Sequence, residues 1–73
     1  MILDAAARQR LRERAQCALL RPIPERIQQG SADQARDYKE CAAKAASFIR
    51  TGHDAKRAAT SVARLESMQG VQR

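Results

Sequence analysis

The sequence is poor in the residues from which catalytic and metal sites are usually built. Its 73 residues include one histidine, two cysteines, one tyrosine, one phenylalanine and no tryptophan. A structural zinc site needs about four Cys or His ligands, and this chain offers neither that number nor a CxxC pair. It also lacks a glycine-rich phosphate loop and a GxSxG turn. We therefore expect a protein that is not an enzyme and that holds no metal, no cofactor and no small-molecule substrate.

Long apolar runs are missing as well. No stretch approaches the roughly 20 apolar residues that span a bilayer, and Met1-Ile2-Leu3 leads directly into charge instead of into the apolar core of a signal peptide. Two cysteines are too few for the disulfide framework of a small secreted domain. We expect a cytoplasmic protein without a membrane partner, in which Cys17 and Cys41 are reduced and buried as small hydrophobic residues.

Alanine and arginine are abundant, and both favour helix. Strand-forming residues are few and nowhere alternate with polar ones over four or more positions. The net charge is +6, and arginine outnumbers lysine eleven to three. The positive charge is spread over both halves of the chain instead of lying in one tail. The sequence therefore predicts an all-α fold and a single basic domain over residues 1–73.

Prolines and glycines predict where the helices end. Pro22 and Pro24 interrupt the first helical segment, because proline lacks the N–H donor and biases the preceding residue away from helix. Gly30, Gly52 and Gly70 each follow a helical segment, where glycine commonly ends a helix. We expect helices over residues 3–20, 32–50 and 54–68, a short helical turn over 25–28 and a frayed tail over 70–73.

Capping residues predict where the helices begin. Asp4 is suited to the start of the first helix, either as its cap or in its first turn. Ser31 and Gln34 fit a capping box, in which the serine hydroxyl accepts from the third helical N–H and the glutamine reaches back. Asp54 is expected to cap the last helix.

Apolar residues at helical spacing predict the core. In the segment 32–50 the apolar face consists of Gln34, Tyr38, Cys41, Ala42, Ala45, Phe48 and Ile49. In the segment 54–68 it consists of Ala55, Ala58, Ala59, Val62 and Leu65. The first helix has two apolar strips, one of Ala7, Leu11, Ala15 and Ala18 and one of Ile2, Ala6, Cys17 and Leu20. Either this helix is central and touches both others, or one of its strips contacts a partner.

The run Arg8-Gln9-Arg10-Leu11-Arg12-Glu13-Arg14 is the first candidate binding surface. Arg8 and Arg12 should flank one side of the Leu11 face, and Arg10 and Arg14 the other, because alternate helical positions point about 200° apart. One interpretation is a solvated face whose arginine stems cover the edge of the core. The other is a docking surface for an acidic protein patch or a phosphate backbone, formed by Arg8, Arg10, Leu11, Arg12 and Arg14.

The last helix offers a second candidate surface, formed by His53, Lys56, Arg57, Thr60 and Arg64. If the last two helices form a helix-turn-helix unit, these residues would enter the major groove of DNA. The long first helix of the pair and the loose spacing of the unit argue against this. Weak, salt-sensitive binding to nucleic acid is expected from the charge alone.

In length, charge and helical composition, the chain resembles the small phage-encoded transcription regulators that bind the RNA polymerase of their host. No motif carries the resemblance, so it assigns no role to any residue. It implies a partner, bacterial RNA polymerase, and a mechanism in which binding alone alters initiation or termination. An arginine-edged apolar strip fits a protein interface, so this is our first hypothesis. A helix-turn-helix DNA-binding protein is the second, and a structural or assembly subunit the third.

Overall fold

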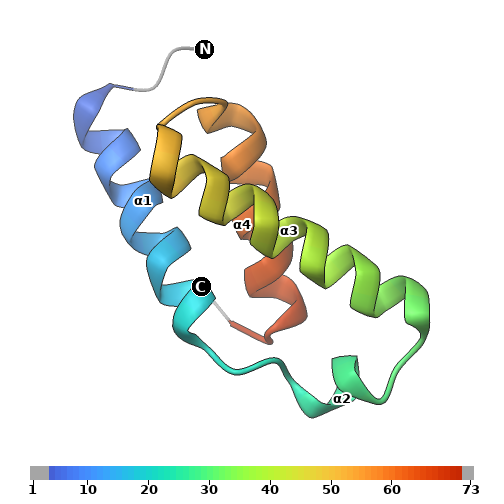
Figure 1. The fold of residues 1–73 in the computed structure, drawn as a ribbon. Coiled ribbons are helices and arrows are strands. Elements are labelled where there is room, and N and C mark those ends of the chain that lie inside the picture. Colours follow the sequence, from blue (N-terminus) through green and yellow to red (C-terminus); the bar gives the residue numbers. More distant parts are fainter. Residues whose placement is uncertain (1–3, 72–73) are drawn as a thin grey trace.

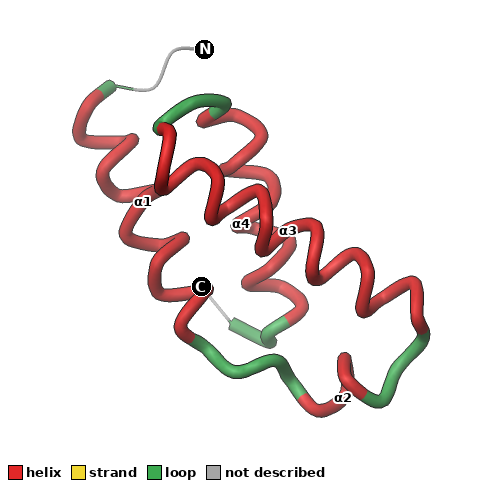
Figure 2. The backbone as a smooth tube through the Cα atoms, viewed as in Figure 1, coloured by secondary structure: helices red, strands yellow, loops and turns green. Residues whose placement is uncertain are grey.

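The chain folds into three long helices and one short helical turn, as the sequence predicts. In this computed structural model, residues 4–71 are described. The elements are α1 (Ala5–Leu20), α2 (Glu25–Gln28), α3 (Ala32–Thr51) and α4 (Ala55–Met68). The described part of the chain contains no strand, and its connections are short (Figure 2). The all-α fold class is thus confirmed.

The helices pack around α3, which contacts every other element. α1 and α4 lie against α3 and also against each other. The N-terminal half of α3 extends beyond them, and the short α2 packs there (Figure 1). Accordingly, the molecule is elongated, with extents of 38 × 21 × 20 Å.

Side-chain caps mark the starts of α1 and α3, whereas α2 and α4 begin without a capping hydrogen bond from a side chain. Asp4 caps α1 by accepting from the N–H of Ala7 at 2.6 Å, so the predicted start near Leu3 shifts to Ala5, while Leu3 itself lies outside the described residues. Ser31 caps α3 by accepting from the N–H of Gln34 at 3.2 Å, but the Gln34 side chain does not bond back in the described chain. Gln34 is exposed, contrary to prediction, because the first turn of α3 projects past the other helices.

The predicted cap of the last helix is only half right. Asp54 occupies the N-cap position of α4, but its side chain makes no capping hydrogen bond. Its φ of 55° lies in the left-handed region, and so does that of Gly52 at 70°. Two left-handed residues allow the three-residue joint to turn sharply, and aspartate is among the few residues that tolerate this conformation. The predicted helix 54–68 therefore begins one residue later, and α3 ends one residue beyond Arg50.

The end of α4 is more ordered than predicted. Gly70 has a φ of 78°. Its N–H donates to the backbone carbonyl of Ser67 at 3.1 Å, and the N–H of Val71 donates to the backbone carbonyl of Glu66 at 3.0 Å. This pair of bonds is a Schellman motif, which satisfies the last carbonyls of a helix. The predicted fraying is therefore wrong for Gly70 and Val71, and residues 72 and 73 lie outside the described chain.

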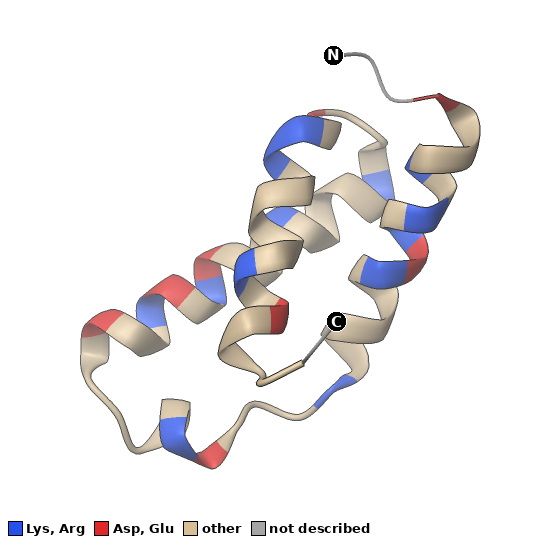
Figure 3. Ribbon diagram, turned by 180° about the vertical axis from the view of Figure 1, so that it is seen from behind, with Lys and Arg blue, Asp and Glu red and all other residues tan. Residues whose placement is uncertain are grey.

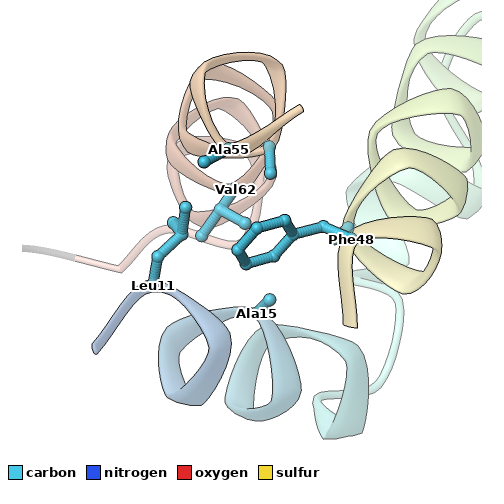
Figure 4. Packing of buried hydrophobic residues seen from close by; sticks show 7 residues of the cluster. Leu11, Ala15, Phe48, Ala55 and Val62 are labelled. Atoms are coloured by element: carbon cyan, nitrogen blue, oxygen red, sulfur yellow. The ribbon is translucent and has the colours of Figure 1, made fainter. Parts of the chain in front are cut away.

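The core forms two clusters along the bundle. The Phe48 cluster joins α1, α3 and α4 and consists of Leu11, Ala15, Ala45, Phe48, Ala55, Ala58 and Val62. The ring of Phe48 projects from α3 into the space between Ala15 of α1 and Val62 of α4 (Figure 4). Only the phenylalanine ring is large here, and alanines on the facing helices allow their backbones to approach it. Its predicted burial is confirmed, with 2% of Phe48 exposed.

The Tyr38 cluster lies nearer α2 and consists of Ala18, Ile27, Tyr38, Cys41 and Leu65. Tyr38 is buried, so its hydroxyl needs a hydrogen-bond partner. Gln69 supplies it: its Nε2 lies 2.8 Å from the Tyr38 hydroxyl and 2.8 Å from the Ala18 carbonyl. One amide at the end of α4 thus ties all three long helices together.

Candidate binding surfaces

Two arginines of α1 lie at the C-terminal end of α3, and one of them forms a hydrogen bond to it. Arg8 Nη1 donates to the Gly52 carbonyl at 2.8 Å. Arg12 lies beside the same residue, with its Nη2 3.7 Å from the position that a Cβ at Gly52 would occupy. The last carbonyls of a helix carry partial negative charge, so guanidinium groups there are favourable. Arg12 Nε is buried and has no hydrogen-bond partner in the described chain. Arg8 therefore contributes a contact within the fold, whereas Arg12 lies half-buried beside it.

Arg14 pairs with a buried carboxylate of α4. Its Nη2 lies 2.6 Å from Glu66 Oε1, and its Nε lies 3.5 Å from Oε2. The Glu66 side chain is 8% exposed and that of Arg14 is 35% exposed. A two-pronged guanidinium–carboxylate pair is directional and stronger than a neutral hydrogen bond. Arg14 thus fixes α1 against α4.

The first predicted contact surface is therefore largely taken up by the fold. Leu11, which we placed at its centre, is 4% exposed and belongs to the Phe48 cluster. Arg8 forms a hydrogen bond to the end of α3, Arg14 pairs with Glu66 of α4, and Arg12 is half-buried. Of the five residues, Arg10 alone is exposed and free of hydrogen bonds and ion pairs within residues 4–71.

The second apolar strip of α1 faces outward. Together with two charged residues it forms what we call the outer strip: Ala6, Arg10, Glu13, Cys17 and Leu20. All five are exposed and share the helix face opposite the core. α1 touches both α3 and α4, as one of the two interpretations expected, but it does so through its Leu11 face, and Ile2 of the second strip lies outside the described residues. The expected burial of Cys17 is wrong, because Cys17 lies on the opposite face.

The outer strip continues past the end of α1. Leu20 is 86% exposed and Ile23 is 42% exposed, and these are the two large hydrophobic residues exposed in the described chain. Arg21 lies between two shallow hollows: one of about 480 Å³ toward Cys17, and one of about 180 Å³ toward Ile23. Neither Arg21 nor Ile23 is among the residues that the sequence predicts for a binding surface. The signal was present, since an isoleucine between two prolines lies in extended chain and has no helix face to bury it.

A second surface lies between α3 and α4, which we call the α3–α4 groove. It has a volume of about 400 Å³ and is lined by Asp37, Glu40, Cys41, Lys44, Lys56, Arg57, Thr60, Ser61 and Arg64. Four of the five residues predicted for the last helix line it. The fifth, His53, lines an adjoining pocket of about 100 Å³ together with Lys44 and Arg57. Figure 3 shows that Lys and Arg lie on α1, α3 and α4, so no single helix holds the charge.

The charges of the groove are unequally paired. Arg64 Nη2 lies 2.7 Å from Asp37 Oδ2, so this arginine is neutralised by α3. Lys44, Lys56 and Arg57 are exposed and make no hydrogen bond or ion pair with other residues of the described range 4–71 through their side chains. Sequence reasoning missed Lys44, because nothing local indicates which side of α3 faces α4.

Cys41 lies at the inner side of the groove and is buried, as expected. Its Sγ is 4.0 Å from Asp37 Oδ1, to which the thiol donates. Burial, and next the negative charge of Asp37, raise the pKa of the Cys41 thiol above its ordinary value. This thiol is therefore harder to ionise than an ordinary cysteine, whereas Cys17 lies on the open outer strip.

Comparison of the chain with known protein families, curated proteins and solved structures found no match. Between residues 4 and 71, His, Cys, Asp and Glu side chains nowhere gather in threes that could hold a metal ion. Over the same residues, no helix combines the length and apolar character needed to cross a membrane. What the structure offers for function is thus a pair of surfaces of different character.

Proposed function

We propose that this protein is a non-enzymatic transcription regulator that binds a host protein complex through the outer strip and its extension, Arg21 and Ile23. The expected partner is bacterial RNA polymerase in the cytoplasm, as the resemblance in length, charge and composition implies. Binding alone would then alter initiation or termination.

The observation that carries a protein partner is the exposure of Leu20. A leucine that is 86% exposed gains nothing from this fold, and Ile23 lies exposed three residues away. Exposed apolar side chains with arginines beside them are the composition found at the centre of protein interfaces. Arg10 and Arg21 supply that setting, because both are exposed and line the same hollow beside Cys17.

The charge of the protein supports the same partner. A chain of charge +6 is steered toward acidic protein surfaces and toward nucleic acid, and a complex that handles nucleic acid can offer the latter. No observation favours the alternative of a sequence-reading helix-turn-helix protein. Its predicted contact residue Arg64 is paired with Asp37, so binding a guanine edge through this guanidinium would compete with that ion pair.

The test is capture of purified bacterial RNA polymerase by immobilised wild-type protein and by two variants. Leu20→Glu places a charge on the outer strip, and Ala43→Glu places the same charge on an exposed site of α3 outside both surfaces. We expect Leu20→Glu to reduce capture by about tenfold or more, since a charge in an apolar contact is strongly unfavourable. Ala43→Glu should leave capture unchanged.

Two results would contradict the proposal. If wild-type protein does not retain the polymerase, the partner is wrong. If both variants retain it equally well, the outer strip is not the contact surface. Circular dichroism of both variants checks that each remains helical.

A further inference from the structure

We propose that the α3–α4 groove binds the sugar-phosphate backbone of duplex DNA without reading its sequence. This goes beyond the proposed function and does not depend on it, because the groove and the outer strip share no residue. A regulator with both surfaces would hold its protein partner with one and the adjacent DNA with the other.

Three cations of the groove have no ion-pair partner within the described residues. Lys44 of α3 and Lys56 and Arg57 of α4 line one groove from its two walls, and all three are exposed. None of them forms an ion pair within the described range. Asp37 and Glu40 also line the groove, so its four cations exceed its two carboxylates, and an anion placed beside the cations reduces their mutual repulsion. The two walls of this groove therefore favour a ligand of negative charge.

The side chains that line the groove fit a phosphate backbone better than they fit an acidic protein. The residues that line the groove include no leucine, isoleucine, valine, methionine or aromatic side chain. A protein partner would find no apolar anchor there, whereas interfaces between proteins usually have one at their centre. Phosphate contacts need only arginine, lysine and hydroxyl donors. The outer strip has the opposite character, with Leu20 and Ile23 exposed.

The groove is not suited to recognising the bases of DNA. Arg64 is held by Asp37 at 2.7 Å. Asp37 and Glu40 line the groove beside the cations, and their carboxylates would repel a phosphate that lay against them. The backbone is therefore expected to contact Lys44, Lys56 and Arg57, and the remaining arginine of the groove is engaged by Asp37. Binding should then depend on salt and be indifferent to sequence.

The experiment measures binding to a short, labelled, mixed-sequence DNA duplex by fluorescence anisotropy over a range of salt concentrations. Three phosphate contacts predict that log K falls against log salt with a slope of about −2.7. The double variant Lys56→Gln with Arg57→Gln should lower affinity by about tenfold at low salt and reduce the slope to about −0.9. Lys44→Gln, on the opposite wall, should reduce the slope by about 0.9.

The matched control is Lys39→Gln with Arg50→Gln. It removes the same charge from two exposed positions of α3 that do not line the groove. We expect its slope to equal that of the wild type and its affinity to fall by less than about threefold. A duplex of the same composition in scrambled order should bind equally well. Circular dichroism confirms folding, and Lys44→Gln serves as the test if the α4 double variant unfolds.

Three results would overturn the proposal. Equal losses in the groove variant and the control variant would mean that net charge alone attracts DNA. Competition by polyglutamate as strong as that by DNA of equal total charge would assign the groove to an acidic protein. A marked preference for one duplex over its scrambled form would show that bases are read after all.

Discussion

The arginines of α1 and the cations of the α3–α4 groove carry the same charge but have different neighbours. On α1, Arg8 contacts the Gly52 carbonyl and Arg14 contacts Glu66, so both guanidinium groups lie within the fold's own contacts. In the groove, Lys44 of α3 and Arg57 of α4 line opposite walls, and neither forms an ion pair within the described residues. Composition and spacing do not separate these two groups.

The role of a basic side chain therefore depends on which groups it contacts in the folded protein. A cation that already contacts a carbonyl or carboxylate contributes to stability, and its loss exposes or leaves unpaired the group it contacted. A cation without such a contact contributes little to stability and is available for binding. Substitutions should therefore divide into those that weaken folding and those that weaken binding.

The largest effect should come from Phe48→Ala, which removes the side chain that supports both surfaces. Phe48 is 2% exposed and packs between α1 and α4. Truncation of a buried phenylalanine costs about 3–5 kcal/mol, which is much of the stability of a chain this small. We expect loss of the helical circular dichroism signal or a strongly lowered urea midpoint.

Leu20→Ala is the control for that experiment. Leu20 is exposed, so its truncation should change stability by no more than about 0.5 kcal/mol. A Phe48→Ala protein as stable as Leu20→Ala would show that the assigned core is wrong.

A smaller effect should separate two arginines of the same helix. Arg14→Gln removes the ion pair that joins α1 to the buried Glu66 carboxylate and should cost about 1 kcal/mol, a figure reduced for the partial exposure of Arg14. Arg10→Gln removes an exposed side chain and should cost less than about 0.5 kcal/mol. Urea unfolding of both variants measures the difference, and equal midpoints would contradict the structural role of Arg14.

The smallest perturbation is chemical labelling of the two cysteines, which requires no substitution. Cys17 lies on the outer strip and should react with iodoacetamide at neutral pH. Cys41 is buried and its thiol pKa is raised, so it should react at least about tenfold more slowly in the folded protein. Mass spectrometry after proteolysis measures both rates. Faster labelling of Cys41 would mean that the groove opens more than the structure shows.

Binding of a protein partner on the outer strip should slow the labelling of Cys17. Binding of DNA in the α3–α4 groove should leave the rate at Cys17 unchanged. The same reagent thus reports which of the two surfaces is occupied.

Much of the fold was predictable because its signals are local. Asp4 and Ser31 cap helices through bonds to residues three positions away, and Pro22 and Pro24 interrupt one helix wherever the others lie. The burial of Phe48 follows from its place on an apolar face. Gln34 fits that face in the sequence as well, but it is exposed because α3 extends past its neighbours at this end.

The binding surfaces were less predictable, since they depend on how the helices are turned about their axes. Local sequence is sufficient to place the helices, most of their ends and the excess of positive charge, because propensity, capping and charge act within a few residues. Helix packing is what brings Arg14 to Glu66 and Arg64 to Asp37, and it leaves Leu20 exposed. These contacts join residues 27 to 52 positions apart, and packing alone sets which sides of two helices face each other.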